Sequence, residues 1–405
     1  MKKISVIGGG PAGIMAAAAA ASCGNKVIIF EKNDDLGRKL LITGKGRCNI
    51  TNSAPIEDFI KNVPVNGNFL YSAFYGFTND DLINLLSELG LETKVERGGR
   101  VFPTSDKSRD VLSALKRLLK KYGVGVVHAE VEKITPDGDE KIVRLKDGRA
   151  VRCDAVIIAT GGASYPRTGS TGDGYRFARA LGHTVVAPKP SLVPIELSGS
   201  LVGKLMGLSL KNVAVEIRRG GKEVYSDFGE MIFTHFGASG PVILSASSHI
   251  KHPEKGGYTL RIDLKPALDE KTLDRRILRD FEPLKNKDLI NSLDALLPKK
   301  MIPVIVELSG IEPHRKINEI TKAQRGELVH AIKNLEFGIK KFRPIDEAIV
   351  TSGGVSVREI KPSTMESKLV PGIFFAGEVI DVDAYTGGFN LQIAFSTGYA
   401  AGKNA

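Results

Sequence analysis

Three glycines near the start of the chain have the spacing of a phosphate-binding turn. Gly8, Gly10 and Gly13 form a GxGxxG pattern directly after a β-branched run at residues 4–7, which predicts a buried strand. In such a turn the first glycine allows the sharp bend from strand to helix, the second lets the backbone approach a pyrophosphate, and the third lets the helix pack closely on the strand. The free N–H groups at the start of the following helix would bind the phosphates.

An acidic residue lies where the ribose of a bound dinucleotide would be. A second strand-like run at residues 26–30 ends in Glu31, 18 residues beyond Gly13. A Rossmann unit places an acid near this position to accept hydrogen bonds from the ribose hydroxyls. Because an acid there disfavours a 2′-phosphate, the sequence predicts FAD or NAD rather than NADP at this site.

Three later segments favour FAD over NAD. Residues 36–52 are glycine-rich and basic, where a simple dehydrogenase would continue into another helix. Residues 155–162 form an apolar run that ends in Ala-Thr-Gly-Gly, and residues 372–378 form another that ends in a glycine and an acid. The latter leads through residues 385–392 into a helix of small residues, whose first amides could stabilise negative charge on a reduced flavin.

With these motifs the chain resembles the bacterial BaiN-like, aminoacetone-oxidase-like NAD(P)/FAD-dependent oxidoreductases. The resemblance covers nearly the whole chain and rests on residues 37–52, 99–103, 160–174, 351–355, 364–368 and 377–392. It implies an FAD-dependent oxidoreductase that transfers hydride between flavin N5 and a small organic substrate, with NAD(P)H or dioxygen as the other redox partner. It does not identify the substrate, because members of this family are credited with different reactions.

The resemblance also implies which residues contact the cofactor. They come from the phosphate turn, the acid at residue 31, the segments at residues 36–52, 155–162 and 372–392, and one further strand. They are Gly8, Gly10, Ala12 and Gly13 at the pyrophosphate, Glu31 at the ribose, Arg38 and Lys39 on the phosphate and flavin side, Gly46, Arg47 and Asn49 in the same glycine-rich segment, Val131 at the adenine, Thr160 and Gly161 near the nucleotide, and Gly377, Glu378, Gly388, Asn390, Leu391 and Gln392 along the ribityl chain and isoalloxazine.

Few residues could act as an acid or a base beside the flavin. Cys48 lies in the flavin-contacting segment, although a single buried cysteine often serves only to pack. His235 lies where a strand gives way to a helix, which is also a common place for a structural turn residue. Tyr165 and Tyr385 could line the pocket. We therefore take His235, Tyr385 and Cys48 as the catalytic candidates.

The source of the electrons is open. The chain contains no second strand–GxGxxG–helix unit, so a dedicated NAD(P)H-binding domain is not expected. Electrons would then come either from a nicotinamide that docks transiently or from the substrate itself.

The predicted fold is α/β, with a split Rossmann-type FAD-binding domain that carries an inserted β-barrel-like domain and a small helical subdomain. The FAD-binding domain comprises residues 1–189 and 347–405, because both parts contain FAD motifs. The barrel-like insert comprises residues 190–265 and a return strand within residues 336–346. Residues 266–335 form the helical subdomain.

The pattern inside the insert predicts individual elements. Short alternating runs at residues 213–217 and 258–264 are typical of antiparallel strands. Helix signals begin at residues 268–271, and further helices are expected over residues 284–297 and 321–335.

Composition excludes several classes of protein. The 405 residues are 42% hydrophobic and 25% charged, as in an ordinary globular chain that is neither disordered nor collagen-like. The three cysteines form no CxxC pair, so zinc ribbons and dithiol centres are excluded and a reducing compartment is expected. His249 and His252 have no further ligands nearby in the sequence, so no metal site is predicted. Since no apolar stretch is long enough for a bilayer, we expect a cytoplasmic protein.

The formal charge of +11 leaves an alternative function open. Residues 265–345 carry 17 Lys+Arg against 12 Asp+Glu, which fits a solvated helical surface, attraction of an anionic substrate or weak contact with nucleic acid. The alternative is thus an FAD-dependent protein that modifies or binds nucleic acid such as tRNA. No RNA-binding motif supports it, so nucleic acid is not the expected partner. A flavin-binding sensor without turnover is a third hypothesis.

Overall fold

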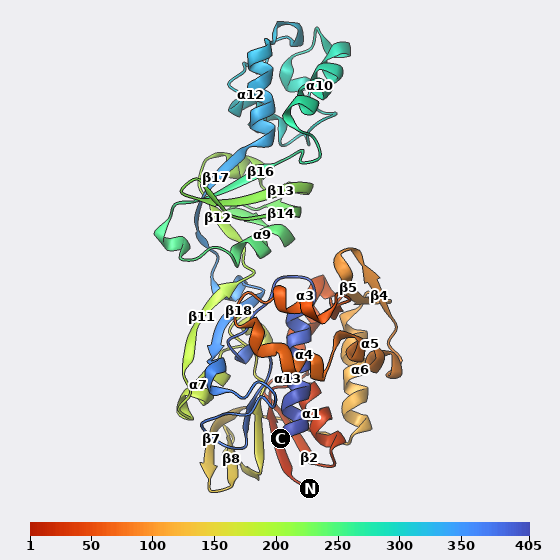
Figure 1. Ribbon diagram of the computed structural model, residues 1–405, viewed down its shortest axis with the longest axis vertical. Helices are drawn as coiled ribbons and strands as arrows, with labels where there is room; N and C mark the ends of the chain where they lie inside the picture. The colour runs from red at the N-terminus through yellow and green to blue at the C-terminus, as the bar shows by residue number, and fades with distance from the viewer. The chain divides into compact units, whose positions relative to one another are not determined.

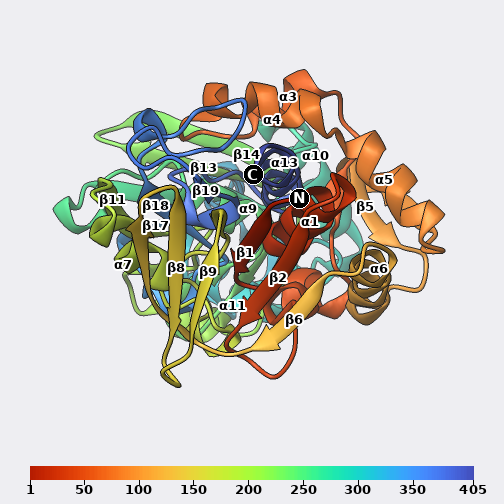
Figure 2. The ribbon, with the colours of Figure 1, turned by 90° about the horizontal axis from the view of Figure 1, so that it is seen from below.

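Short apolar runs, buried in all but the edge strand Gly125–His128, form a five-stranded parallel sheet in the computed structural model, which describes residues 1–405. All four neighbouring strand pairs are parallel (Figure 2). The central strand is buried from Ile4 to Ile7. Since parallel sheets are covered on both faces, their strands read as continuous apolar runs rather than alternating ones. In sheet order the strands are β19 (Ile373–Phe375), β10 (Ala155–Ile158), β1 (Lys3–Ile7), β2 (Lys26–Glu31) and β6 (Gly125–His128).

The chain divides into two compact units, of which the first is built from two separate stretches of sequence. The first unit comprises Met1–Ser191 and Pro344–Ala405, and the second comprises Leu192–Arg343 (Figure 1). The parallel sheet draws β19 from the later stretch and its other strands from the earlier one. The nucleotide-binding unit is therefore complete only when both stretches are folded together.

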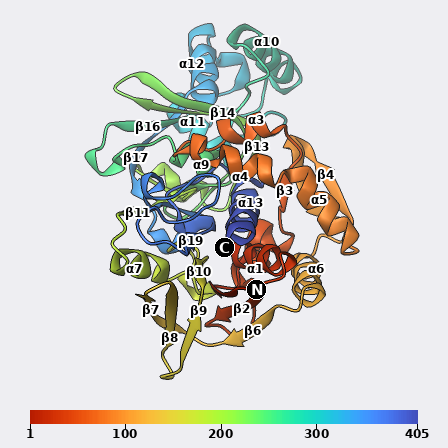
Figure 3. The ribbon, with the colours of Figure 1, turned by 60° about the horizontal axis from the view of Figure 1, so that its bottom comes forward.

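Two helices of small residues pack against each other in the first unit. They are α1 (Pro11–Ser22) and α13 (Phe389–Asn404), which lie side by side (Figure 3). A Cβ added at Gly398 would lie 2.4 Å from the carbonyl oxygen of Ala12, and one added at Gly402 would lie 2.2 Å from that of Ala16. The two backbones thus approach too closely for any side chain at these positions, which explains why α13 carries glycine at residues 398 and 402.

Further helices and small sheets surround this core. α6 (Ser108–Lys121) packs on α1, and its buried residues follow the helical period. The other elements of the first unit are α2 (Arg38–Ile42), α3 (Ile56–Lys61), α4 (Tyr71–Gly76), α5 (Asn79–Glu88) and α7 (Asp173–Ala180), the three-stranded sheets β3 (Thr51–Asn52), β5 (Arg100–Pro103), β4 (Thr93–Glu96) and β7 (Val131–Asp137), β8 (Glu140–Leu145), β9 (Ala150–Cys153), and the antiparallel pair β11 (Val185–Ser191) and β18 (Val350–Val355).

The second unit contains a closed six-stranded barrel. Side chains of β16 alternate strictly between buried and half-buried positions, as expected of a strand with one face in a core. In order around the barrel the strands are β12 (Ile195–Leu197), β15 (Gly237–Ser239), β14 (Lys222–Phe233), β13 (Ser209–Arg219), β16 (Tyr258–Asp263) and β17 (Leu335–Phe342), and the helices are α8 (Leu201–Leu205), α9 (Pro241–Ser247), α10 (Glu270–Phe281), α11 (Ile302–Leu308) and α12 (Lys322–Lys333).

The predicted fold class, an α/β Rossmann-type domain with an inserted barrel, is confirmed. The helix expected from residue 321 is present as α12, where Thr321 and Gln324 form a capping box. The division of the second unit into a barrel domain and a separate helical subdomain stays a prediction. No helix combines the length and the apolar character that crossing a membrane requires.

The helix predicted over residues 284–297 is wrong. Only 3₁₀ turns form there, at Glu282–Leu284 and Leu289–Asn291. The backbone N–H groups of Leu289 and Ile290 donate to the carbonyls of Arg315 and Pro313 instead of to a preceding helical turn. Leu289, Leu293, Leu296 and Leu297 are buried in the core of the second unit, and their spacing imitates a helical face.

We expect Gly398→Ala to lower the free energy of unfolding by about 1–3 kcal/mol, because its methyl group would force α1 and α13 apart. Chemical denaturation, followed by circular dichroism, measures the change. Gly326→Ala in α12 is the matched control, because a Cβ there meets no atom within 4 Å. The control should stabilise the protein by about 0.4–1 kcal/mol. Equal unfolding of Gly398→Ala and the unmodified protein would contradict the packing argument.

Candidate cofactor and active site

The phosphate turn between β1 and α1 contains two kinds of glycine: Gly8 and Gly13 pack against backbone atoms, whereas Gly10 faces open space. A Cβ at Gly8 would lie 2.6 Å from the carbonyl oxygen of Ala159, and one at Gly13 would lie 1.9 Å from that of Gly8. A Cβ at Gly10, in contrast, would meet no protein atom within 4 Å. Gly10 is also the N-cap of α1, and no side chain caps this helix or places an acid in its first turn. An open space beside uncapped N–H groups fits a pyrophosphate.

Glu31 is fixed beside this turn. Its side chain is 7% exposed, and its Oε2 accepts a hydrogen bond from the N–H of Gly9 at 2.8 Å. Its Oε1 accepts from the N–H and the Nδ2 of Asn33 at 2.8 and 2.6 Å. Arg38 in turn donates to Asn33 Oδ1 at 2.8 Å. Because an ionised carboxylate has about four acceptor positions, Glu31 can still accept from a ribose hydroxyl.

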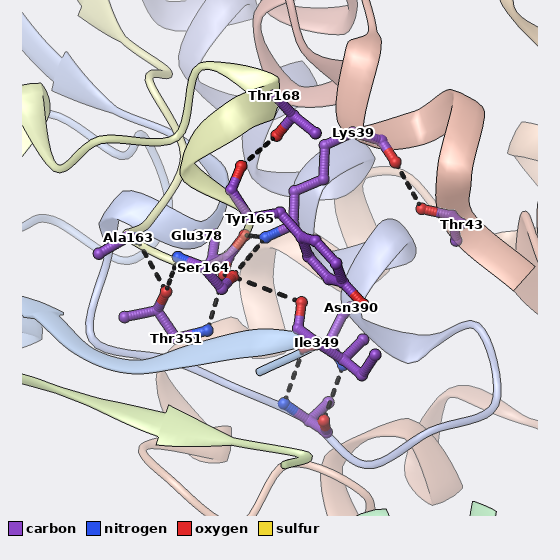
Figure 4. A network of polar contacts seen from close by, with 11 residues as sticks. Lys39, Thr43, Ala163, Ser164, Tyr165, Thr168, Ile349, Thr351, Glu378 and Asn390 are labelled. Atoms are coloured by element: carbon purple, nitrogen blue, oxygen red, sulfur yellow. Dashed lines mark hydrogen bonds and ion pairs between the residues drawn. The ribbon is translucent and has the colours of Figure 1, made fainter. Parts of the chain in front are cut away.

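A polar network joins Lys39 to three segments that are distant in sequence. Lys39 Nζ lies 2.7 Å from both Ser164 Oγ and Glu378 Oε2 (Figure 4). Glu378 Oε1 accepts from the N–H of Thr351 at 2.7 Å and from Ser164 Oγ at 3.1 Å. Thr351 Oγ1 accepts from the N–H groups of Ala163 and Ser164 at 2.8 and 3.0 Å. We call Lys39, Ser164, Thr351 and Glu378 the Lys39 network.

The Lys39 network shows what the sequence analysis missed. Lys39 and Glu378 were each predicted to contact FAD, whereas in the structure their side chains pair with each other. Ser164 and Thr351 were not among the predicted site residues, although both lie in recognised motifs. A motif marks such positions, but only the tertiary structure shows that the Ser164 hydroxyl group bonds both Lys39 and Glu378, which are distant in sequence.

The amide side chains at the start of α13 bind protein groups. Asn390 Oδ1 accepts from the N–H of Ala384 at 2.9 Å, and its Nδ2 donates to the Ala384 carbonyl at 2.7 Å. Buried Gln392 accepts from Thr51 Oγ1 at 2.7 Å and donates to the Phe77 carbonyl at 3.2 Å. Asn390 therefore shapes the loop before α13, whereas Gln392 joins α13 to β3 and to the end of α4. The helix is capped by Gly388 without a side-chain hydrogen bond, so its first N–H groups are available to a ligand.

Two predicted cofactor residues carry a buried oxygen without a hydrogen-bond partner. They are Asn49, through Oδ1, and Thr160, through Oγ1. Buried polar atoms are nearly always hydrogen-bonded, so each oxygen fits a donor or acceptor of a bound molecule. Together with the space at Gly10, these atoms show that the first unit fits FAD.

Arg47 pairs with two carboxylates of the protein, and its predicted contact with FAD stays a prediction. Its guanidinium pairs with Glu96 and Asp106, each at 2.5 Å, and lies 4.2 Å from the centre of the Phe102 ring. Hydrogen bonds to Glu96 and Asp106 raise the pKa of Arg47 further above its already high value. These contacts hold the glycine-rich segment against the sheet of β4 and β5.

The other cofactor candidates all belong to the first unit. Gly46 and Gly161 have positive φ angles of 85° and 74°, which a glycine adopts freely. Val131 begins β7 as a buried residue, and Gly377 approaches Ala12 so closely that an added Cβ would lie 2.8 Å from the Ala12 Cβ. Leu391 is half-buried in the first turn of α13. Their contacts with FAD stay predictions.

The three catalytic candidates differ in setting. Burial raises the pKa of the Cys48 thiol to about 12, so this group is protonated at neutral pH and its setting favours packing. Tyr385 is half-buried, and burial together with the charge of Asp383 raises the pKa of its phenol. His235 belongs to the second unit and is not placed with the other two. A catalytic role for any of them stays a prediction.

Two buried acids next to Tyr385 were not predicted as site residues. Asp383 is 1% exposed, and its Oδ2 accepts from Ser191 Oγ at 2.7 Å while its Oδ1 has no partner. Burial raises its pKa, and the charges of Asp381 and Glu378 add to the shift. Burial also raises the pKa of Asp381. Burial therefore favours the protonated form of each of these two carboxyl groups.

Comparison with known proteins agrees with this geometry. The family model described as HI0933-like protein Rossmann domain matches residues 2–404. The 3-dehydro-bile acid Δ(4,6)-reductase of Clostridium scindens is 34% identical over 100% of this chain and 99% of its own length. The ribosomal RNA dihydrouridine synthase of Haemophilus influenzae is 33% identical over 98% of this chain and 96% of its own. In fold, the chain is similar to the 3-ketosteroid-Δ4-(5α)-dehydrogenase of Rhodococcus jostii, with a TM-score of 0.50, 16% identity, and coverage of 100% of this chain and 96% of that one.

We expect Gly10→Ala to weaken FAD binding by about 10- to 100-fold, because its methyl group would occupy the space for the pyrophosphate. Thermal unfolding of the apoprotein should not change, since no protein atom lies within 4 Å of the new Cβ. Titration of the apoprotein with FAD measures the affinity. Gly76→Ala, another glycine with open space around it, is the control and should bind FAD normally. Normal FAD binding by Gly10→Ala would move the pyrophosphate away from this turn.

We expect iodoacetamide at pH 8 to label exposed Cys23 in the native protein and to spare Cys48. With a pKa of about 12, only about one Cys48 in ten thousand is a thiolate at that pH, and the thiolate is the reactive form. Peptide mass spectrometry identifies the labelled residues, and denatured protein serves as the positive control. Rapid labelling of native Cys48 with loss of activity would restore it as a catalytic candidate.

Proposed function

Because the chain belongs to the HI0933-like Rossmann family, we propose that this FAD-dependent oxidoreductase reduces a carbon–carbon double bond conjugated to a carbonyl group in a small organic molecule. We further propose NAD(P)H as the source of electrons. Dioxygen is the alternative redox partner, which would make the protein an oxidase of amines or alcohols.

The main support for this proposal is the reaction named for the similar reductase of Clostridium scindens. Its substrate is a 3-dehydro bile acid reduced at Δ4 and Δ6, positions at which a double bond is conjugated with the 3-oxo group. Dihydrouridine likewise differs from uridine by saturation of a double bond beside a carbonyl. Both names thus describe one reaction class, addition of hydride and proton across an electron-poor double bond.

The residues of the first unit support this reaction in separate ways. The turn at Gly10 and the carboxylate of Glu31 would hold the pyrophosphate and ribose of FAD. FAD, when bound, supplies the hydride. The uncapped N–H groups of α13 would stabilise negative charge at its N-terminus. The second carbon of the double bond needs a proton from an acid such as Tyr385, whose pKa is raised by burial.

A uridine base in RNA is the second candidate substrate. Two relatives, 33% and 30% identical, are named ribosomal RNA dihydrouridine synthases, and this chain has a net charge of +11. The reaction would be the same, with a larger substrate attracted through its phosphates. This candidate differs from a small molecule in its dependence on salt.

We expect the visible flavin band of the purified protein to bleach within seconds when NADH or NADPH is added without oxygen. The band should return when a conjugated enone such as a Δ4-3-oxosteroid is then added. A saturated 3-oxosteroid of the same skeleton is the matched control and should leave the protein reduced, because it offers no double bond to accept hydride.

Two other outcomes would revise the proposal. A flavin that ignores both nicotinamides but bleaches with amines or alcohols would identify an oxidase instead. Reoxidation by unmodified ribosomal RNA, with dihydrouridine found by mass spectrometry and no reoxidation by any enone, would select the RNA substrate.

A further inference from the structure

Tyr165 has a backbone conformation that is unfavourable for its residue type. Its φ and ψ angles are 52° and 57°, in the left-handed region that bulky side chains rarely adopt. It also precedes Pro166, and the proline ring further restricts the residue before it. Such strain persists only where surrounding contacts impose it, and it concentrates at functional sites.

Contacts on both sides of Tyr165 impose this conformation. Ser164, directly before it, is fully buried and belongs to the Lys39 network. On the other side, the N–H and the Oγ1 of Thr168 both donate to the Tyr165 carbonyl at 2.8 Å. The backbone is thus fixed by the same network that joins the FAD segments (Figure 4).

The side chain itself makes no contact within the protein that would account for the strain. Its hydroxyl group forms no hydrogen bond, its ring stacks on no other aromatic ring, and it is not part of the hydrophobic core. Leu192 and Met365 also have positive φ angles, but both are fully buried in the protein, where packing can stabilise them. Tyr165 is only half-buried.

We propose that Tyr165 is the proton donor of the reduction. This inference rests on the proposed function, and it names the acid that the function requires. The hydride bonds to one carbon of the double bond while the Oη–H bond of Tyr165 breaks and a C–H bond forms at the other carbon. The resulting phenolate takes a proton from water, and NAD(P)H supplies the two electrons.

The setting of the phenol suits this role. Burial raises the pKa of Tyr165 above its ordinary value, so the group carries its proton at neutral pH. An acid that stays protonated until a carbanion-like carbon develops beside it transfers its proton only in the reaction itself. The fixed backbone would hold the hydroxyl in position for that transfer.

The test separates the two halves of the reaction in Tyr165→Phe, which keeps the ring and removes the hydroxyl. FAD content and bleaching by NAD(P)H should match the unmodified protein. Reoxidation by the conjugated enone should slow by about 100-fold or more, and the solvent deuterium isotope effect on this step should change. Tyr71→Phe, at an exposed tyrosine of α4, is the matched control and should leave both halves unchanged.

A second variant tests the strain without relying on turnover. Tyr165→Gly should leave the melting temperature of the apoprotein unchanged or raise it, because glycine adopts this conformation freely. It should lose the same reoxidation step as Tyr165→Phe. A lower melting temperature would show that the side chain stabilises the fold, which would overturn the inference.

Failure of the inference can be told from failure of the proposed function. If no conjugated acceptor reoxidises the unmodified protein, the proposed function is wrong and the inference falls with it. If the unmodified protein is reoxidised and Tyr165→Phe reacts equally fast, only the inference is wrong. Loss of the step in Tyr385→Phe but not in Tyr165→Phe would likewise overturn it and assign the proton to Tyr385.

Discussion

The ion pair between Lys39 and Glu378 joins the parts of the site that the chain brings from distant positions. One partner follows the second strand of the parallel sheet and the other follows its last strand, and Ser164 and Thr351 connect two further segments to the pair. The side chains of the two charged residues are 24% and 20% exposed, so solvent weakens their attraction. The hydrogen bonds around the pair have a larger effect, because loss of one partner would leave several polar atoms buried and unpaired.

Much of the fold and part of the site could be predicted because the signals were local. The strands of the parallel sheet are continuous apolar runs, and the phosphate turn and Glu31 lie within one strand–helix–strand unit. Roles that depend on tertiary contacts could not be read in the same way. The ion pairs of Arg47 with Glu96 and Asp106 could not be predicted, because these residues come together only after folding. The spacing of the leucines around residue 289 predicted a helix for the same reason, since nothing local shows that the segment pairs with residues 313–317.

Burial has the same effect on four acidic groups of the first unit. It raises the pKa values of Cys48, Tyr165, Asp383 and Tyr385, because each would become negatively charged on losing its proton. Burial thus favours the protonated form of each of these groups, and a reaction that ends with proton transfer to carbon needs a group that carries a proton. Sequence alone shows which residues can carry a proton, whereas their surroundings decide whether they do.

The division of the nucleotide-binding unit into two stretches has a consequence for how the protein matures during synthesis. α1 is translated before residues 192–343, whereas its packing partner α13 follows only after those residues have been translated. The earlier stretch therefore stays incompletely folded, with the apolar face of α1 uncovered, while residues 192–343 leave the ribosome and can fold by themselves. Capture of the cofactor then becomes a late event, and a nascent chain that stalls inside the insert has no finished site in which to hold a flavin.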